Sequence, residues 1–155
     1  MVRHGEYVSE DNDEDRYLLS DLGKAQMDVL SRIIKDIAVE DAYLVTSPER
    51  VALESAKLLA DKLGLSNIET SMHLWAGDIG PTERNYMADP KRVHDFLMSV
   101  KNKSNVLIVV THGEILERYL SYFWKNEMNL EDEFQKPKKG HMVHFNINNK
   151  TYKYY

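Results

Sequence analysis

The segment Met1-Val2-Arg3-His4-Gly5-Glu6 places an arginine, a histidine and a glycine in a row, directly after two apolar residues. If the apolar residues end a buried strand, Arg3 and His4 lie at its carboxyl end, where open α/β sheets bind ligands. Gly5 lets the backbone turn sharply because it has no Cβ. A guanidinium can hold phosphate oxygens, and an imidazole beside it can attack the phosphorus. The segment therefore predicts phosphate chemistry, provided that the rest of the chain brings further cations to the same place.

Two more strands are predicted to end in residues of the same kind. The apolar run Val106–Val110 is followed by Thr111-His112-Gly113, and the run Ala42–Thr46 is followed by Ser47-Pro48-Glu49-Arg50. If these strands and the first one are parallel, their carboxyl ends lie at one edge of the sheet. Two histidines and two arginines then converge on a single pocket, which strengthens the prediction of a phosphate site.

A long amphipathic helix is predicted after the first strand. The acidic and polar stretch 6–15 is expected to be a solvated loop, and Ser20 is a suitable N-cap for the helix that follows. Apolar side chains then recur every three or four residues up to about residue 37, which is the spacing of one helix face. The apolar positions expected on that face are Leu22, Ala25, Val29, Ile33 and Ile37.

Three further helices are predicted downstream. Ser47 is expected to cap the second helix, with Pro48 at its first position and Gly64 at its end. The face of this helix consists mostly of small residues, which would let it lie close to the sheet. Asp89-Pro90 is expected to begin the third helix. The fourth follows Thr111-His112-Gly113.

The remaining strands complete an α/β pattern. Ile68–Ser71 is predicted to be a short strand, and the stretch 72–86, which contains two glycines and a proline, is predicted to be a loop. Met142–Ile147 and Lys150–Tyr155 are predicted to form a hairpin on the two-residue turn between them. The order of elements predicts one domain over residues 1–155. Its fold is an α/β three-layer sandwich, with a mainly parallel central sheet flanked by helices and a C-terminal hairpin.

Composition excludes several classes of protein. The chain has 20 Lys and Arg against 25 Asp and Glu, so its net charge of −5 does not favour nucleic acid, and a phosphate site must concentrate its cations locally. Because there is no cysteine, disulfides, thiolate catalysis and thiolate metal sites are excluded. No apolar run approaches the roughly 20 residues of a membrane-spanning helix, and the N-terminus lacks the apolar core of a signal peptide. We therefore expect a cytoplasmic protein without nucleic-acid or membrane partners.

With these motifs in order, the whole chain resembles the histidine phosphatase superfamily, whose fold is phosphoglycerate-mutase-like. Arg3-His4-Gly5 resembles the opening motif of that family, and Ser20-x-x-Gly23-x-x-Gln26 resembles its first-helix signature. Ser47-Pro48 with Arg50 resembles the second motif, and Thr111-His112-Gly113 the third. The short length is most similar to the small branch that includes the phosphohistidine phosphatases. The segment Leu74–Gly80 is similar to the short central loop of that branch.

The resemblance implies a mechanism with no cofactor and no metal. His4 would be the nucleophile and would form a phosphohistidine that water then hydrolyses. Arg3, Arg50 and His112 would bind the phosphoryl oxygens and stabilise the charge of the transition state, and Gly113 would belong to the same phosphate-binding site. His4 must be neutral on its attacking nitrogen, and a backbone carbonyl near Gly5 is the expected acceptor for its other nitrogen.

The sequence departs from the family pattern in its arginines and in its first strand. The family usually has an arginine three residues after the proline of the second motif, where this chain has Val51. Arg50 comes one residue earlier, which is about 100° around a helix. Arg84 or Arg16 is the alternative source of the second guanidinium. The first strand is also short, because only two residues precede Arg3, and a few further residues upstream are expected.

The general acid of the family has no clear counterpart here. Asp78 is the first candidate, with Glu83 and Glu114 as alternatives, and each is equally compatible with a solvated carboxylate. If the acid is absent, the site suits a leaving group that needs little help, such as the nitrogen of a phosphoramidate on histidine. His141, which precedes the last predicted strand, is a further candidate for a polar residue near the phosphate.

Three functions remain open from the sequence. The first is a phosphatase that acts on a phosphorylated small molecule or a phosphoprotein. The second is a catalytically weak phospho-ligand binding or regulatory module, which the shifted Arg50 and the unclear acid favour. The third is a phosphoglycerate-type mutase, which the short length disfavours. The oligomeric state also stays open, although the C-terminal tyrosines are compatible with a weak dimer through a sheet edge.

Overall fold

A four-stranded parallel sheet forms the centre of the protein in the computed structural model, which describes residues 1–9, 17–37, 41–76, 89–130 and 134–155. The strand order is β1-β6-β4-β5, and each neighbouring pair is parallel. The strands are β1 (Val2–Arg3), β4 (Ala42–Thr46), β5 (Ile68–Thr70) and β6 (Val106–Thr111). The apolar runs of β4 and β6 pair over five residues at the middle of the sheet, as expected for strands covered on both faces.

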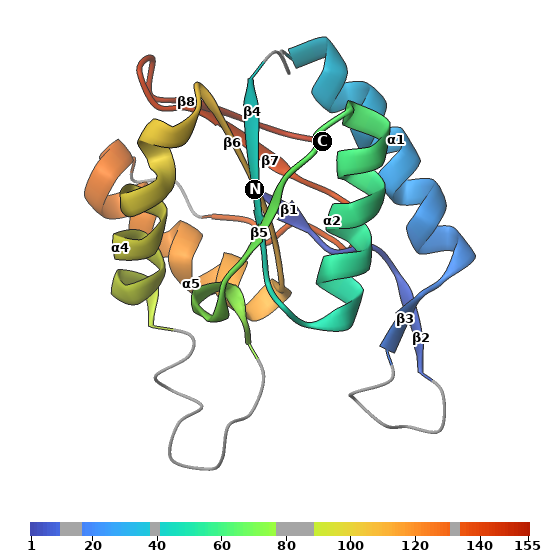
Figure 1. Ribbon diagram of the computed structural model, residues 1–155. Helices are drawn as coiled ribbons and strands as arrows, with labels where there is room; N and C mark the ends of the chain where they lie inside the picture. The colour runs from blue at the N-terminus through green and yellow to red at the C-terminus, as the bar shows by residue number, and fades with distance from the viewer. Residues whose placement is uncertain (10–16, 38–40, 77–88, 131–133) are drawn as a thin grey trace.

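Helices cover the two faces of this sheet in pairs (Figure 1). On one face lie α1 (Asp21–Ile37) and α2 (Arg50–Leu63), and on the other lie α4 (Pro90–Val100) and α5 (Gly113–Phe123). The shorter turns are η2 (Met72–Leu74), η3 (Lys101–Lys103) and η4 (Trp124–Met128). The predicted three-layer α/β sandwich is therefore confirmed. Among the described residues, no helix combines the length and the apolarity needed to cross a membrane.

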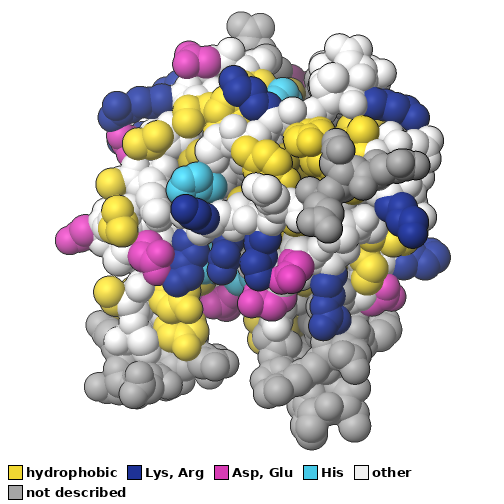
Figure 2. Space-filling view, turned by 180° about the vertical axis from the view of Figure 1, so that it is seen from behind, with side chains coloured by type: hydrophobic (Ala, Val, Ile, Leu, Met, Phe, Trp, Pro, Cys, Tyr) yellow, Lys and Arg dark blue, Asp and Glu magenta, His cyan; other side chains and the backbone are white. Residues whose placement is uncertain are grey.

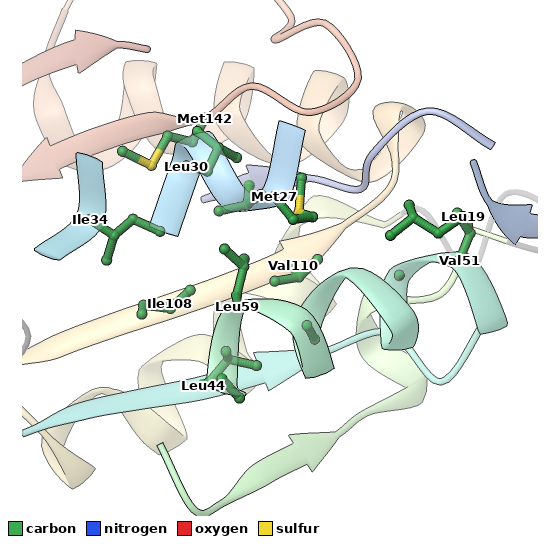
Figure 3. Close-up of a cluster of buried hydrophobic side chains, with 14 residues drawn as sticks. Leu19, Met27, Leu30, Ile34, Leu44, Val51, Leu59, Ile108, Val110 and Met142 are labelled. Carbon is green, nitrogen blue, oxygen red and sulfur yellow. The ribbon is translucent and has the colours of Figure 1, made fainter. Parts of the chain in front are cut away.

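The first hydrophobic core lies between the sheet, α1 and α2 (Figure 3). Side chains of α1 point toward those of α2 over β4 and β6, and they are almost completely shielded from water. The larger members of this core are Met27, Leu30, Ile34, Leu44, Leu59, Ile108, Val110 and Met142. The small residues Ala52, Ala56 and Ala60 are buried on the inner face of α2, and their size lets the helix lie close to the sheet, as predicted.

The inward face of α1 differs from the predicted one. Leu22 and Val29 are 60% and 53% exposed, and Ala25 is exposed as well. The buried positions are Gly23, Met27, Leu30, Ser31 and Ile34. A shift by one residue rotates a helix face by about 100°. The apolar pattern was therefore wrong at these three positions, because the close contact of Gly23 with the backbone of Glu6 fixes which side of the helix faces inward.

The second core lies on the other face of the sheet and includes the C-terminal hairpin of β7 (Val143–Asn146) and β8 (Thr151–Tyr154). The hairpin was predicted, but its two-residue turn was wrong. Asn146 pairs with Thr151, so four residues connect the strands. The Asn146 side chain accepts a hydrogen bond from the backbone N–H of Asn149 at 3.1 Å, and Lys150 has a positive φ of 51°, which together close the longer turn.

An antiparallel pair near the N-terminus was not predicted. β2 (Tyr7–Ser9) pairs with β3 (Tyr17–Leu19), and the rings of Tyr7 and Tyr17 lie 4.5 Å apart. The acidic composition of the stretch 6–15 indicated a loop, which was wrong for residues 7–9, because Tyr7 and Val8 are residues that strands favour and Tyr7 contacts Tyr17 across the pair. The rest of that stretch lies outside the described residues.

Parallel pairing brings three strand ends to one edge of the sheet, at the bottom of Figure 1. Val2 of β1 and Thr46 of β4 are both in register with Val110 of β6. The residues that follow these strand ends are therefore neighbours in space. This is the edge at which the sequence predicts a phosphate site.

Helix α1 is positioned against that edge by two glycines. A Cβ on Gly23 would lie 2.1 Å from the carbonyl oxygen of Glu6, and a Cβ on Gly5 would lie 2.8 Å from the carbonyl oxygen of Gly23. The Ser20 hydroxyl caps the same helix by accepting a hydrogen bond from the backbone N–H of Gly23 at 3.1 Å, as predicted. The backbone after His4 can approach α1 this closely only where side chains are absent.

We expect Gly23→Ala to lower the free energy of unfolding by about 2 kcal/mol, because the added methyl group forces the Glu6 backbone away from α1. Helix propensity alone predicts the opposite sign, since alanine stabilises a helix interior by about 1 kcal/mol relative to glycine. Urea unfolding monitored by circular dichroism measures the difference. Lys35→Ala, at an exposed position of α1, is the control and should change stability by less than about 0.5 kcal/mol. A Gly23→Ala protein as stable as wild type would contradict the close approach.

Candidate active site

His4 directly follows β1 and is held by its neighbours on both sides. Its backbone N–H donates to the carbonyl of Thr111 at 3.0 Å, and its carbonyl accepts a hydrogen bond from Gly140 at 2.9 Å. The ring Nδ1 lies 2.9 Å from the carbonyl oxygen of Gly5. A carbonyl can only accept, so Nδ1 carries the proton and Nε2 of the neutral ring keeps its lone pair. The acceptor expected near Gly5 is therefore present.

The surroundings of His4 keep its ring neutral. The residue is only 5% exposed, and the His112 ring centroid lies 5.3 Å from its own. Burial, and then the charge of His112, lower the pKa of His4 to about 4. At neutral pH this imidazole is therefore an uncharged nucleophile, which is the state that attack on phosphorus requires.

His112 stands at the N-cap position of α5 and uses both ring nitrogens. Nε2 lies 2.8 Å from the hydroxyl oxygen of Ser47, and Nδ1 lies 2.8 Å from a carboxylate oxygen of Glu49. His112 and Ser47 are both buried. The ring is therefore fixed by two residues of the connection between β4 and α2, and it faces His4 in one orientation.

The same connection explains why α2 begins later than predicted. Ser47 was expected to cap the helix with Pro48 in its first turn, but α2 begins at Arg50 and Glu49 takes the cap position. The Ser47 hydroxyl still accepts a hydrogen bond from the Glu49 N–H at 3.2 Å, yet it also contacts His112. The prediction that Ser47 caps α2 with Pro48 in its first turn was therefore wrong. The Ser47 hydroxyl contacts both the His112 ring and the Glu49 N–H, and the helix begins only after Glu49.

Glu49 is a site residue that sequence reasoning missed. Burial opposes its ionisation, but the hydrogen bond and the charge of His112 outweigh burial, so the pKa of Glu49 is lowered and the carboxylate is charged at neutral pH. Phosphate ligands are expected to be cations or neutral donors, so the sequence did not predict a carboxylate from this strand end in the site. The available signal was a carboxylate two residues after Ser47, at the edge shared with His112.

Arg3 lies beside Gly113, at the start of α5. A Cβ on Gly113 would lie 2.9 Å from the guanidinium carbon of Arg3, so only glycine leaves this space free. Nη1 of Arg3 donates to the carbonyl of Pro137 at 3.3 Å, whereas its buried Nε–H has no hydrogen-bond partner among the described residues. A charged donor that is buried without an acceptor is costly, and a bound anion would satisfy it.

Arg50 does not join this group. It is the first residue of α2, its side chain is 53% exposed, and its Nε lies 3.3 Å from a carboxylate oxygen of Glu54. Val51, which takes the position of the family's arginine, is buried in the first core. Among the described residues, the predicted phosphate-binding contact of Arg50 thus has no geometric support, because the side chain at the matching position points into the core.

The other candidates lie outside this group. Asp78, Glu83, Arg84 and Arg16 fall outside the described residues. Glu114 is exposed in the first turn of α5, and the His141 ring is exposed, with Nδ1 3.0 Å from the carbonyl oxygen of Lys139. In the described part of the chain, no three His, Asp or Glu side chains gather as a metal site.

Gln26 ties the segment after His4 to the C-terminal part of the chain. Its amide oxygen accepts the Glu6 N–H at 2.8 Å, and its amide nitrogen donates to the Lys139 carbonyl at 3.2 Å. The Lys139 ammonium pairs with Glu6 at 2.6 Å and lies 3.9 Å from the centre of the Tyr7 ring. On the face opposite to that of Figure 1, basic side chains gather in a row with acidic ones beside it (Figure 2).

Comparison with solved structures identifies similar folds. The protein histidine phosphatase SixA, solved with tungstate, matches with a TM-score of 0.70 at 16% identity over 99% of this chain and 91% of its own. A mycobacterial glucosyl-3-phosphoglycerate phosphatase, solved with inorganic phosphate, matches with a TM-score of 0.58 at 16% identity over 80% of this chain and 77% of its own. YhfR of Bacillus stearothermophilus matches with a TM-score of 0.57 at 20% identity over 79% of this chain and 77% of its own.

This chain has the histidine phosphatase fold. The predicted phosphoglycerate-mutase-like architecture is confirmed by the parallel sheet, the paired helices and the C-terminal hairpin together with these matches. No family model and no curated protein sequence matches the chain. The likeness therefore rests on the fold, and the chemistry of the site has to be argued from this chain's own residues.

The low pKa of His4 predicts how stability depends on pH. Between pH 6.5 and pH 4 the unfolded chain protonates this histidine while the folded protein does not, so the unfolded state binds more protons and stability falls as pH falls. In urea unfolding, wild type should lose about 3 kcal/mol more than His4→Asn between pH 7 and pH 4. Equal losses in the two proteins would mean that His4 is not held neutral by the fold.

The two arginines should differ in phosphate binding. Arg3→Ala should weaken the binding of inorganic phosphate at least about 10-fold because it removes a buried, charge-assisted donor, whereas Arg50→Ala should change it less than about 3-fold. Arg3→Lys keeps the charge and tests the planar geometry of the guanidinium. Isothermal titration calorimetry measures all four proteins. A larger effect for Arg50→Ala than for Arg3→Ala would restore Arg50 to the site.

Proposed function

We propose that this protein is a metal-independent phosphatase that acts through a phosphohistidine on His4. The observation that carries this proposal is the hydrogen bond from Nδ1 of His4 to the Gly5 carbonyl, because it leaves Nε2 of a neutral ring free to attack. Arg3 and His112 lie around that ring, and both can bind phosphoryl oxygens.

The proposed reaction has two displacements at phosphorus. Nε2 of His4 attacks the phosphoryl group, the bond to the leaving group breaks, and the leaving group departs with the electron pair. Water then attacks the phosphohistidine, which releases inorganic phosphate and restores the neutral ring. The unpartnered Nε–H of Arg3 is suited to stabilise the charge of both transition states. We further propose that Gly113 belongs to the phosphate-binding site, where the absence of a side chain leaves room for this guanidinium.

The leaving group decides whether an acid is needed. Asp78 remains the proposed acid, with Glu83 and Glu114 as the alternatives. A phosphoramidate such as phosphohistidine needs less help than an ester, since its nitrogen can be protonated before the bond breaks. The proposed substrates are therefore a phosphoprotein, with phosphohistidine tried first, or a phosphorylated small molecule, in the cytoplasm. The SixA neighbour is a protein histidine phosphatase, whereas the mycobacterial neighbour is a sugar-phosphoglycerate phosphatase.

The second candidate function is a phospho-ligand binding module with weak catalysis. The observation that favours it is the composition of the second motif. Val51 is buried, Arg50 pairs with Glu54, and Glu49 places a carboxylate against His112. A site with one arginine fewer and one carboxylate more stabilises the transition-state charge less well. Among the described residues, we find no comparable observation that favours a mutase.

His4→Ala should lower the hydrolysis of p-nitrophenyl phosphate at least about 10³-fold, because no other group supplies the attacking nitrogen. The assay is run with a metal chelator. His144→Asn, at a hairpin position paired with Lys153, is the control and should retain wild-type activity. Brief incubation of wild type with labelled substrate should also trap a phosphoryl group that is stable in alkali and lost in acid.

The outcomes separate the two candidates. Undiminished hydrolysis by His4→Ala would show that the assigned nucleophile is wrong. If wild type and His4→Ala are equally inactive while both bind phosphate, the binding module is the better reading. A phosphohistidine peptide assayed beside a sugar phosphate then identifies the class of substrate.

A further inference from the structure

Glu49 occupies the one ring nitrogen of His112 that a ligand could reach. Nε2 of His112 is directed at Ser47, whose side chain is fully buried and whose backbone N–H donates to the Val110 carbonyl at 3.1 Å. This contact is therefore part of the packed core. Nδ1 is directed at the Glu49 carboxylate, which is 23% exposed. A phosphoryl oxygen that is to accept a hydrogen bond from His112 must compete for Nδ1.

The Glu49 carboxylate also lies within the electrostatic reach of His4. Burial opposes its charge, and the hydrogen bond to His112 together with the charge of His112 offsets this opposition, so the pKa of Glu49 stays lowered. The Glu49 carboxylate therefore contacts the ring nitrogen of His112 from which a bound phosphate would accept its hydrogen bond. The carboxylate is thus comparable to an internal ligand of the site.

Glu49 is also more accessible than Ser47, whose side chain is fully buried. It stands at the N-cap of α2, and its side chain makes no capping hydrogen bond to the helix in the part of the chain that the structure describes. Rotation of its side chain would release Nδ1 without disturbing the backbone of α2. The neighbouring Val51 adds no positive charge that would favour a small anion over the carboxylate.

We propose that Glu49 is a specificity-determining residue that occupies the anion position at His112 and that a bound phosphoryl group must displace. This inference rests on the proposed function only for the identity of the ligand. A charged carboxylate in this position weakens the binding of any phosphoryl group. Free phosphate is affected most, because a larger substrate also gains binding free energy from contacts of its remaining part with the protein. Glu49 then favours release of the inorganic phosphate product.

The opposite role for Glu49 is a purely supporting one. If Glu49 only orients His112, its removal weakens phosphate binding or leaves it unchanged, because the ring loses the partner that fixes its orientation and no binding position for phosphate becomes available. The two roles therefore predict changes of opposite sign in one measurable quantity, the affinity for inorganic phosphate.

The test is the dissociation constant for inorganic phosphate at pH 8, measured by isothermal titration calorimetry on the whole chain. Glu49→Gln keeps the size of the side chain and removes its charge, and it should bind phosphate at least about 10-fold more tightly than wild type. Glu49→Ala should do the same if the glutamine variant folds poorly, and circular dichroism checks both folds. Where turnover is measurable, the inhibition constant for phosphate should fall by the same factor.

Glu117→Gln is the matched control. Glu117 lies on α5, pairs with Lys136 and lies within the electrostatic reach of Arg3, but in the described part of the chain it forms no hydrogen bond or ion pair with either histidine of the site. Its replacement removes the same charge and should change phosphate affinity less than about 3-fold. Equal or weaker binding by both Glu49 variants overturns the proposal, as does an equal gain in Glu117→Gln. Because binding needs no turnover, tighter binding by Glu49→Gln in a protein without hydrolysis would contradict the proposed phosphatase and leave this inference intact.

Discussion

The short pairing of β1 with β6 is the constraint on which the site depends. β1 has only two residues, yet its register with β6 places His4 beside His112 at one edge of the sheet. The hydrogen bond from the His4 N–H to the Thr111 carbonyl continues this pairing past the end of the strand. A slip of one residue would turn the His4 side chain to the other face of the sheet. Because a two-residue strand forms few hydrogen bonds of its own, its position also depends on contacts with α1, α5 and the C-terminal segment.

Charge and burial oppose each other within the site. Two imidazoles 5.3 Å apart in a buried position cannot both be protonated without a large cost, and burial keeps His4 as the neutral member. Glu49 supplies the negative charge that His112 would otherwise find only in a ligand. His112 thus has a carboxylate partner within the protein, while the buried Nε–H of Arg3 has no acceptor among the described residues.

The sequence predicted the mainly parallel sheet, the four helices and the convergence of His4, His112 and Arg3, because the order of elements along the chain and the polar residues at the strand ends are encoded locally. The sequence did not predict the features that tertiary contacts decide, which are the rotation of α1 and the role of Glu49. Leu22 and Val29 are apolar but exposed, since the Gly23 contact sets the rotation of α1. Glu49 was missed because a carboxylate in a phosphate site becomes meaningful only when its partner, 63 residues away in sequence, is placed beside it.

The contacts of His4 and of its neighbours join residues that lie more than 100 positions apart in the sequence. Its carbonyl is held by Gly140, Val143 donates to the Met1 carbonyl, and Gln26 reaches Lys139. During translation His4 is therefore synthesised well before His112 and before Gly140 and Val143, which later hold the first strand. His4 therefore gains its contacts with Thr111, His112 and Gly140 only after these later segments have been synthesised. The segment that follows Gly140 also contributes Met142 and Val143 to the two hydrophobic cores, so completing the cores and forming the site require the same part of the chain.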